Sequence, residues 1–233
     1  MIDERIAYHL EANGPIVRGE AATAEQLDRM SSSLPQSLVA IVAEYGFASL
    51  CDGAFRFCDP ATMRSILALV FKGDPELQHT NCHVVAHTAF GVLKCWSIAH
   101  GPITVDLPSA MVFSAALAPT EFKDLPDAPV AEVNDPRFAN LTLPLQPDDA
   151  DYDDANAEPL YHRCTAAHGQ VGPDDCYGFF PALALAGPFS QSRRLENIRR
   201  VKAREHYAFL AQVETFALTR IGPSGFEAVR MLG

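Results

Sequence analysis

Apolar residues recur with helical spacing in the first third of the chain. A set at positions i, i+3, i+4 and i+7 occurs twice, as Leu38, Ile41, Val42 and Tyr45 and then as Met63, Ile66, Leu67 and Val70. Gly46 follows the first set where a helix C-cap belongs, and Asp59-Pro60 precedes the second as an N-cap and first helical residue. Thr23 to Gln26 has the Thr-x-x-Gln form of a capping box. The pattern predicts three helices, with a tight turn at Asp52-Gly53 and a short strand over 54–58 between the second and the third.

The pattern changes to short β-type runs between residues 83 and 114. These runs are separated by Gly91, by His100-Gly101-Pro102 and by Pro108, and they cover His83–Phe90, Val92–Ser97, Ile103–Asp106 and Met111–Ser114. Regularly spaced short strands with Gly and Pro between them are typical of an antiparallel sheet.

Residues 119–147 carry six prolines and little periodicity, which predicts a linker or a long ordered loop. Helical patterns then return. One helix is expected from an Asp153 or Asp154 cap to about His168, before Gly169. A long terminal helix is expected from about Arg194 to Arg220.

These elements predict an α+β fold in two lobes. Helices packed on an antiparallel sheet would form an N-terminal domain over residues 1–118. Residues 119–150 would be a Pro-rich and acidic connection, and residues 151–233 a mainly helical C-terminal domain. The chain has 233 residues, of which 48% are hydrophobic and 20% charged, so disorder is excluded and a sizeable core can be buried.

Nothing in the chain resembles a targeting or membrane segment. The first five residues carry mixed charge, unlike a signal peptide, and the longest apolar runs, 66–71 and 179–186, are far shorter than the roughly 20 residues of a spanning helix. The six cysteines form no CxxC pair and are expected to be buried, reduced thiols: Cys51, Cys58, Cys82, Cys95, Cys164 and Cys176. We therefore expect a cytoplasmic protein with no membrane partner.

The charge balance limits the partners. With 18 Lys and Arg against 29 Asp and Glu, the formal net charge is −11, which argues against general nucleic-acid binding and permits a basic protein partner. One segment departs from this balance, because residues 193–204 hold six cations: Arg193, Arg194, Arg199, Arg200, Lys202 and Arg204. They could form the phosphate-binding stripe of a nucleic-acid or tRNA-associated module. The overall charge favours the other interpretation, the solvated face of an amphipathic helix.

The densest negative charge lies just after the Pro-rich stretch, at Asp148, Asp149, Asp151, Asp153 and Asp154. Three of these match the first ligand positions of an EF-hand loop, but Asp154 stands where that loop needs Gly and Leu160 where it needs Glu. A solvated linker with helix-capping Asp residues and a docking surface for a basic partner are the remaining interpretations.

Metal and catalytic motifs are weak or missing. His83 and His87 would lie roughly 13 Å apart on one face of a strand, too far for one metal ion, so sheet histidines with hydrogen-bond partners are expected. Cys164 with His162 and His168 lacks a second ligand pair. The chain has no G-x-S-x-G, P-loop, G-x-G-x-x-G or H-E-x-x-H motif. A metal-dependent hydrolase using carboxylates of 148–158 would need two of them in distinct environments, which the sequence does not indicate. We expect no enzyme, no metal and no cofactor.

Two groups of motifs resemble known domains. The N-terminal group resembles the GAD-like domain, and its members are Leu34-Pro35, Leu38, Ile41-Val42, Glu44-Tyr45-Gly46, Asp52-Gly53, Asp59-Pro60 and Thr88-Ala89-Phe90-Gly91 before Trp96. The C-terminal group is similar to the domain that accompanies it in type VI secretion immunity proteins, and it reads Tyr177-Gly178-Phe179-x-Pro181-Ala182-Leu183-x-Leu185-x-Gly187. Ala186 stands where Gly is commoner.

This pairing resembles the immunity proteins that neutralise a DNase effector in the bacterium that makes it. The resemblance implies an inhibitor without catalytic residues, whose partner is a basic, DNA-binding nuclease toxin encoded nearby. A DNA groove is expected to be positive, so an inhibitor of net charge −11 would be steered toward it. The five aspartates of 148–154 are the expected toxin-binding residues.

Overall fold

The computed structural model describes residue 2, residues 4–119, 136–223 and 225–233. Its N-terminal helices are α1 (Glu4–Ala12), α2 (Ala24–Ser31), α3 (Gln36–Tyr45) and α4 (Pro60–Val70). The capping box is present: Thr23 N–H donates to the Gln26 side chain at 2.8 Å, and Gln26 N–H to the Thr23 hydroxyl at 3.2 Å. Asp59 accepts from Ala61 N–H at 2.9 Å, and Gly46 ends α3 with φ 70°. Three helices are thus confirmed, and α1 comes in addition.

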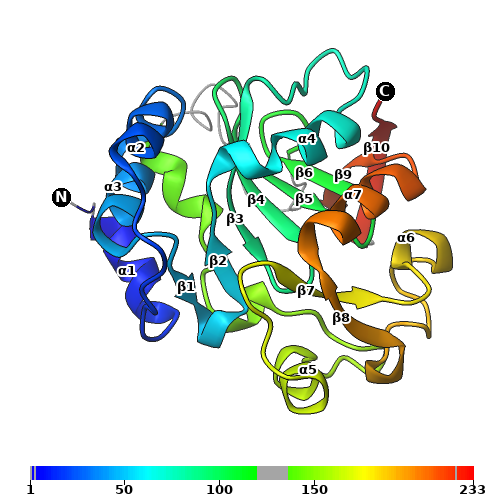
Figure 1. The fold of residues 1–233 in the computed structure, drawn as a ribbon. Coiled ribbons are helices and arrows are strands. Elements are labelled where there is room, and N and C mark those ends of the chain that lie inside the picture. The colour runs from blue at the N-terminus through cyan, green and yellow to red at the C-terminus, as the bar shows by residue number, and fades with distance from the viewer. Residues whose placement is uncertain (1, 3, 120–135, 224) are drawn as a thin grey trace.

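The strands assemble into one sheet of eight and one pair (Figure 1). The large sheet has the order β1-β2-β3-β4-β5-β6-β9-β10. Its members in chain order are β1 (Ser49–Leu50), β2 (Phe55–Phe57), β3 (Cys82–Thr88), β4 (Val92–Ser97), β5 (Gly101–Asp106), β6 (Met111–Ser114), β9 (Ala217–Gly222) and β10 (Gly225–Met231). Every neighbouring pair is antiparallel except β6 and β9, which are parallel. The four strands predicted between residues 83 and 114 are confirmed, but the complete sheet is mixed.

The turn predicted at Asp52-Gly53 is confirmed. It lies in a short 3₁₀ helix, η1 (Cys51–Gly53), and Gly53 adopts φ 96°, a left-handed conformation that glycine tolerates best. The turn brings β1 back beside β2, with Ser49 opposite Arg56.

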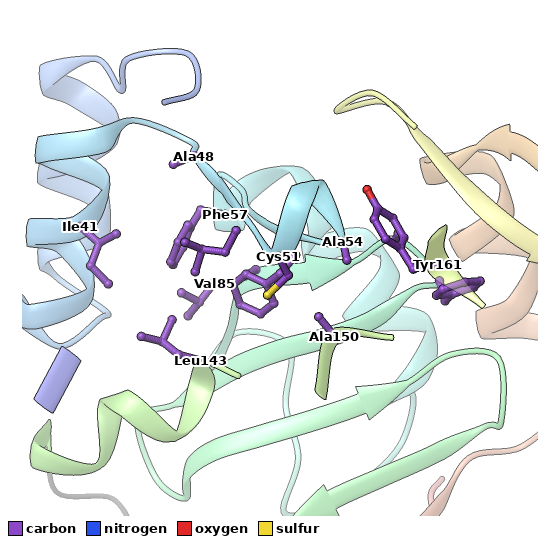
Figure 2. Packing of buried hydrophobic residues seen from close by; sticks show 14 of the residues in the cluster. Ile41, Ala48, Cys51, Ala54, Phe57, Val85, Leu143, Ala150 and Tyr161 are labelled. Carbon is purple, nitrogen blue, oxygen red and sulfur yellow. The ribbon is translucent and has the colours of Figure 1, made fainter. Parts of the chain in front are cut away.

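Two hydrophobic cores lie on opposite faces of the large sheet. Val84 and Val85 are adjacent on β3 yet belong to different clusters, because successive side chains of a strand point to opposite faces. Val84 packs with α4 and with α7 (Ala203–Val213), which contact each other. Val85 packs with α3 and with the segment that follows residue 138, as Figure 2 shows for Ile41, Phe57 and Leu143.

The described part of the Pro-rich stretch is an ordered loop. It contains two 3₁₀ helices, η3 (Pro136–Thr142) and η4 (Pro147–Ala150), and η3 contacts β4, β5, α1 and α3. Ala139, Leu143 and Ala150 are buried in the same hydrophobic core as Val85. His9 of α1 and Asn13, which follows that helix, both contact the carbonyl of Pro144, at 3.1 and 2.7 Å. Of the six prolines, Pro126 and Pro129 lie outside the described residues.

The predicted terminal helix over 194–220 is wrong. That region contains η5 (Leu195–Asn197), β8 (Ile198–Lys202), α7 and β9, and α7 spans only 11 residues. β8 pairs with β7 (Asp175–Phe179) in the separate two-stranded sheet. Apolar residues at 195, 198 and 201 have the spacing of one helix face. In the structure, however, β8 pairs with β7, and β9 pairs with β6, so these segments form strands. The α+β class holds, whereas a mainly helical C-terminal lobe is not what the structure has.

The helix expected from Asp153 or Asp154 to His168 begins later, as α5 (Tyr161–His168), and Gly169 ends it with φ 76°. Neither predicted cap precedes it directly. A further short helix is α6 (Leu183–Ala186). All six cysteines are free, and only Cys58 is not fully buried. Within the described residues, every helix is too short or too polar to cross a membrane.

Candidate partner-binding surface

The five aspartates of 148–154 do not share one environment. Asp154 is the most enclosed, with a side chain about 3% exposed. It accepts hydrogen bonds from the backbone N–H groups of Asn156 and Glu158, at 2.7 and 3.2 Å, and from the Arg163 guanidinium at 2.8 Å. The Arg163 hydrogen bond, helped by the Asn156 N–H, holds the pKa of Asp154 below its usual value. This carboxylate is therefore used inside the fold.

Asp149 and Asp151 serve partly as caps. The Asp149 carboxylate accepts from the N–H groups of Leu145 and Gln146, at 2.9 and 3.2 Å, and so closes the turn that leads into η4. Asp151 accepts from Tyr161 N–H at 2.8 Å and caps α5, in place of the predicted Asp153 or Asp154. Burial raises the pKa of Asp151, and its backbone hydrogen bonds oppose that shift.

Asp148 and Asp153 are exposed, as is the rest of the Asp149 side chain. The structure thus divides the acidic segment into carboxylates that stabilise turns and carboxylates that face solvent. An EF-hand arrangement is not formed, and no group of three or more His, Cys, Asp or Glu among the described residues could hold a metal ion.

An aromatic cluster lies beside Asp153, and the sequence analysis missed it. Phe226 of β10 packs against Phe113 of β6 and against Phe189, with ring centroids 5.5 and 5.7 Å apart. Phe189 and Phe226 stack with their planes 10° apart, yet they are 61% and 48% exposed. The available signal was the alternation of apolar residues after Gly225, in a segment to which we assigned no element.

Two open hollows meet at this cluster. The larger, about 610 Å³, lies between the loop after η3 and the last strands of the sheet, and its lining includes Leu141, Leu145, Asp149 and Ile221. The smaller, about 320 Å³, includes Asp153 and Phe189 in its lining. Phe113 and Phe226 line both, so the hollows are parts of one surface.

A partly buried polar network lines the smaller hollow. The Tyr152 hydroxyl donates to the Asp106 carboxylate and lies 3.1 Å from the Ser109 hydroxyl. Burial raises the pKa of Asp106, which its hydrogen bonds only partly offset. The Arg193 guanidinium stacks over Tyr152 and Phe189, at 5.9 and 5.8 Å from the ring centroids, so this cation belongs to the aromatic surface.

The basic residues of 193–204 do not form a helix face, because five of the six precede α7. On β8, Arg200 and Lys202 both pair with Asp175 of β7, at 2.6 and 2.9 Å. Hydrogen bonds from Lys202 and then Arg200 lower the pKa of Asp175. Arg194 donates to the Gln191 side chain, and Arg199 to the carbonyls of Glu196 and Ile198. Most of these cationic side chains therefore form ion pairs or hydrogen bonds within the protein.

The two strand histidines are both buried, and one has the expected partners. His87 Nδ1 lies 3.2 Å from the Thr88 carbonyl and 3.2 Å from the Tyr207 hydroxyl. Burial lowers the pKa of His87 to about 4, so the ring is neutral at physiological pH. His83 differs, because its Nε2 has no hydrogen-bond partner among the described residues.

Comparison with known proteins identifies two family matches. Residues 4–108 match the model of the GAD-like domain, and residues 137–214 match the model described as T6SS immunity protein Tdi1, C-terminal. These matches confirm the resemblance drawn from the sequence motifs.

A solved structure shares the whole fold. The crystal structure of Atu4351 from Agrobacterium tumefaciens superposes with a TM-score of 0.80, and the match covers 97% of each chain. Sequence identity is 23%, so this likeness concerns the fold alone. No curated protein matches the chain.

Proposed function

We propose that this chain, which its two family matches support as a type VI secretion immunity protein, binds a nuclease toxin and neutralises it. The toxin would be a DNase delivered in competition between bacteria, and the immunity protein would act in the cytoplasm of the cell that makes both. The match of residues 137–214 to an immunity protein domain carries this proposal. The same match suggests a non-enzymatic role.

Electrostatics supports a basic partner. A nuclease must hold a polyanion, so its DNA groove is expected to be positive. The net charge of −11 would steer this protein toward such a groove and accelerate association by 10-fold or more at low ionic strength. Within the acidic segment, Asp148, Asp149 and Asp153 are the carboxylates exposed for this role, while Asp151 and Asp154 hold its turns in shape.

The test is co-expression with the gene that lies beside the gene of this protein, which we expect to encode the nuclease. We expect that gene to be toxic alone and harmless when the full-length chain is present, and we expect the two proteins to co-purify. A matched control is a Leu67→Asp variant, in which a charge in the core on the α4 face should prevent folding and so abolish protection.

Two results would contradict the proposal. One is a neighbouring gene that is not toxic, and the other is a toxic neighbour that the folded protein neither binds nor neutralises. A change in the mobility of labelled DNA or RNA at low salt would instead favour the nucleic-acid module considered from residues 193–204.

A further inference from the structure

Within the residues that the structure describes, the large sheet leaves one end of one face exposed to solvent. β6 alternates, so that Val112 is buried toward α4 and α7 while Met111 and Phe113 point to the opposite face. The same face continues across β9 and β10. In the pairing of the strands, Phe113 of β6 lies opposite Thr219 of β9, and Ile221 of β9 lies opposite Phe226 of β10. Residues 139–150 contact the same face over β4 and β5, whereas Phe226 of β10 stays 48% exposed.

The uncovered end is apolar where a solvated sheet face is normally polar. Ile221, Phe226 and Met231 are 43%, 48% and 54% exposed, and Phe189 adds its ring from the loop before η5. We call Phe113, Phe189, Ile221, Phe226 and Met231 the outer apolar face. Contiguous exposed apolar side chains of this kind mark interaction sites, and aromatic rings are the side chains that most often anchor them.

The rim of the outer apolar face is acidic on the side of the 139–153 loop. Asp149 lines the larger hollow and Asp153 the smaller, and the two hollows share Phe113 and Phe226. The cations that line the two hollows have partners within the protein: Lys94 donates to the Thr104 hydroxyl at 3.4 Å, Arg220 pairs with Glu227 at 3.1 Å, and Arg193 is held against Tyr152 and Phe189. An apolar surface with carboxylates along one edge complements an apolar segment that has Lys or Arg beside it.

We propose that the outer apolar face is where the nuclease toxin docks, through an apolar segment of the toxin flanked by basic residues that meet Asp149 and Asp153. This inference rests on the proposed function and deepens it, because it names the binding surface and assigns different roles to its rings and its carboxylates. The rings of Phe189 and Phe226 provide most of the affinity and slow dissociation. The carboxylates accelerate association.

The test measures binding of the full-length chain to the purified product of the neighbouring nuclease gene, inactivated at its catalytic site. Phe226→Ser is expected to weaken the Kd by about 30-fold, mainly through faster dissociation, as for a central aromatic anchor. Phe209→Ser is the matched control, because Phe209 is 50% exposed but lies on α7, which packs on the other face of the sheet. Its Kd should stay within about 2-fold of wild type, as for an apolar residue outside the interface.

A melting curve of each variant verifies folding. Phe189 lies in a loop, so Phe189→Ser provides a second variant should Phe226→Ser unfold. Asp153→Asn should slow association at low salt and leave dissociation nearly unchanged. Asp149 is kept intact in this variant, because its carboxylate closes the turn before η4.

The outcomes separate the two proposals. A wild-type chain that does not bind the nuclease overturns the proposed function. A wild-type chain that binds, together with folded Phe226→Ser and Phe189→Ser variants of equal affinity, overturns the docking face alone. Sedimentation showing a wild-type dimer that Phe226→Ser dissociates, with unchanged affinity for the nuclease, would assign the face to a second copy of this chain and also overturn it.

Discussion

Two aromatic clusters among the described residues, one around Phe90 and one around Phe226, have nearly the same ring spacing and opposite exposure. Phe90 lies 5.6 Å from Tyr152, 5.6 Å from Tyr177 and 5.8 Å from Phe179, and it is fully buried. Phe226 lies 5.5 and 5.7 Å from its two ring partners and is half exposed. The spacing between ring centroids is thus nearly the same in a cluster that holds the fold together and in one that faces solvent. The two clusters differ in whether other elements of the fold cover them. A covered cluster contributes to stability, and an uncovered one is accessible to a partner.

The Phe90 cluster also joins the two family-matched segments. Phe90 belongs to residues 4–108, whereas Tyr152, Tyr177 and Phe179 belong to residues 137–214. The N–H of Tyr177 donates to the Ala89 carbonyl at 2.8 Å, next to the ring contact. Removing the cluster should therefore weaken the whole fold, and removing the exposed one should not.

The largest expected effect is that of Phe90→Ala. The loss of a fully buried ring should lower the free energy of unfolding by about 3–5 kcal/mol. Phe226→Ala, the same change in the exposed cluster, should lower it by less than about 1 kcal/mol. Urea denaturation of the two variants measures both values. Equal losses would show that exposure does not distinguish the clusters.

A pH titration of stability tests the buried side independently. His87 contacts Tyr207 and has a pKa of about 4 in the folded protein because of burial, while its unfolded value is near 6.5. The unfolded state therefore binds the proton first, and stability should fall by up to about 3 kcal/mol as pH falls from about 6.5 to 4.

His87→Gln should remove most of this pH dependence, whatever its effect on stability at pH 7. His162→Gln is the control for replacing a histidine at an exposed position, away from the contacts of His87. Denaturation curves at pH 7, 6, 5 and 4 give the comparison. A His87→Gln protein that keeps the wild-type slope would contradict the prediction.

The same contrast between buried and exposed groups applies within the acidic segment. Asp154→Asn should lower the melting temperature at pH 7, because the Arg163 ion pair and two backbone hydrogen bonds lose a charged acceptor. The folded pKa of Asp154 is lowered, so its contribution is present above the unfolded pKa and is lost as pH falls through the folded one.

Asp148→Asn is the matched control, since this carboxylate is exposed, and its melting temperature should equal that of the wild type. Differential scanning calorimetry measures both variants. If the two substitutions had equal effects, the division of the segment into turn-holding and solvent-facing carboxylates would be wrong.

The smallest expected effect concerns exposed charge alone. Asp148→Asn with Asp153→Asn should leave folding intact and slow association with the nuclease by less than about tenfold at low salt, with a weaker dependence on ionic strength. Stopped-flow mixing at two salt concentrations is the measurement. An on-rate identical to the wild type at low salt would leave these carboxylates without a role in steering.

The elements that could be predicted from the sequence are those that depend on residues close by in the chain. The capping box at Thr23, the Asp59 cap and strands β4 and β6 depend on neighbours within a few residues, and all were predicted. The segment after Arg194 was not, because β8 and β9 form through partners at Asp175–Phe179 and Met111–Phe113, far away in the chain. The sequence identified the acidic segment as one group of carboxylates. The ion pair of Asp154 with Arg163, which holds this carboxylate inside the fold, could not be predicted from the spacing of the carboxylates.

The sequence by itself determined most helices and strands of the first half, though not α1 or β1, together with the net negative charge and the family resemblance, because each depends on residue type and local spacing. Only the tertiary structure decided which of the described phenylalanines are core and which lie on the outer apolar face. It also decided which aspartates face solvent. The physical reason is that exposure depends on which distant segments cover a side chain. The loop of residues 139–150 covers β4 and β5, and it leaves Phe226 open.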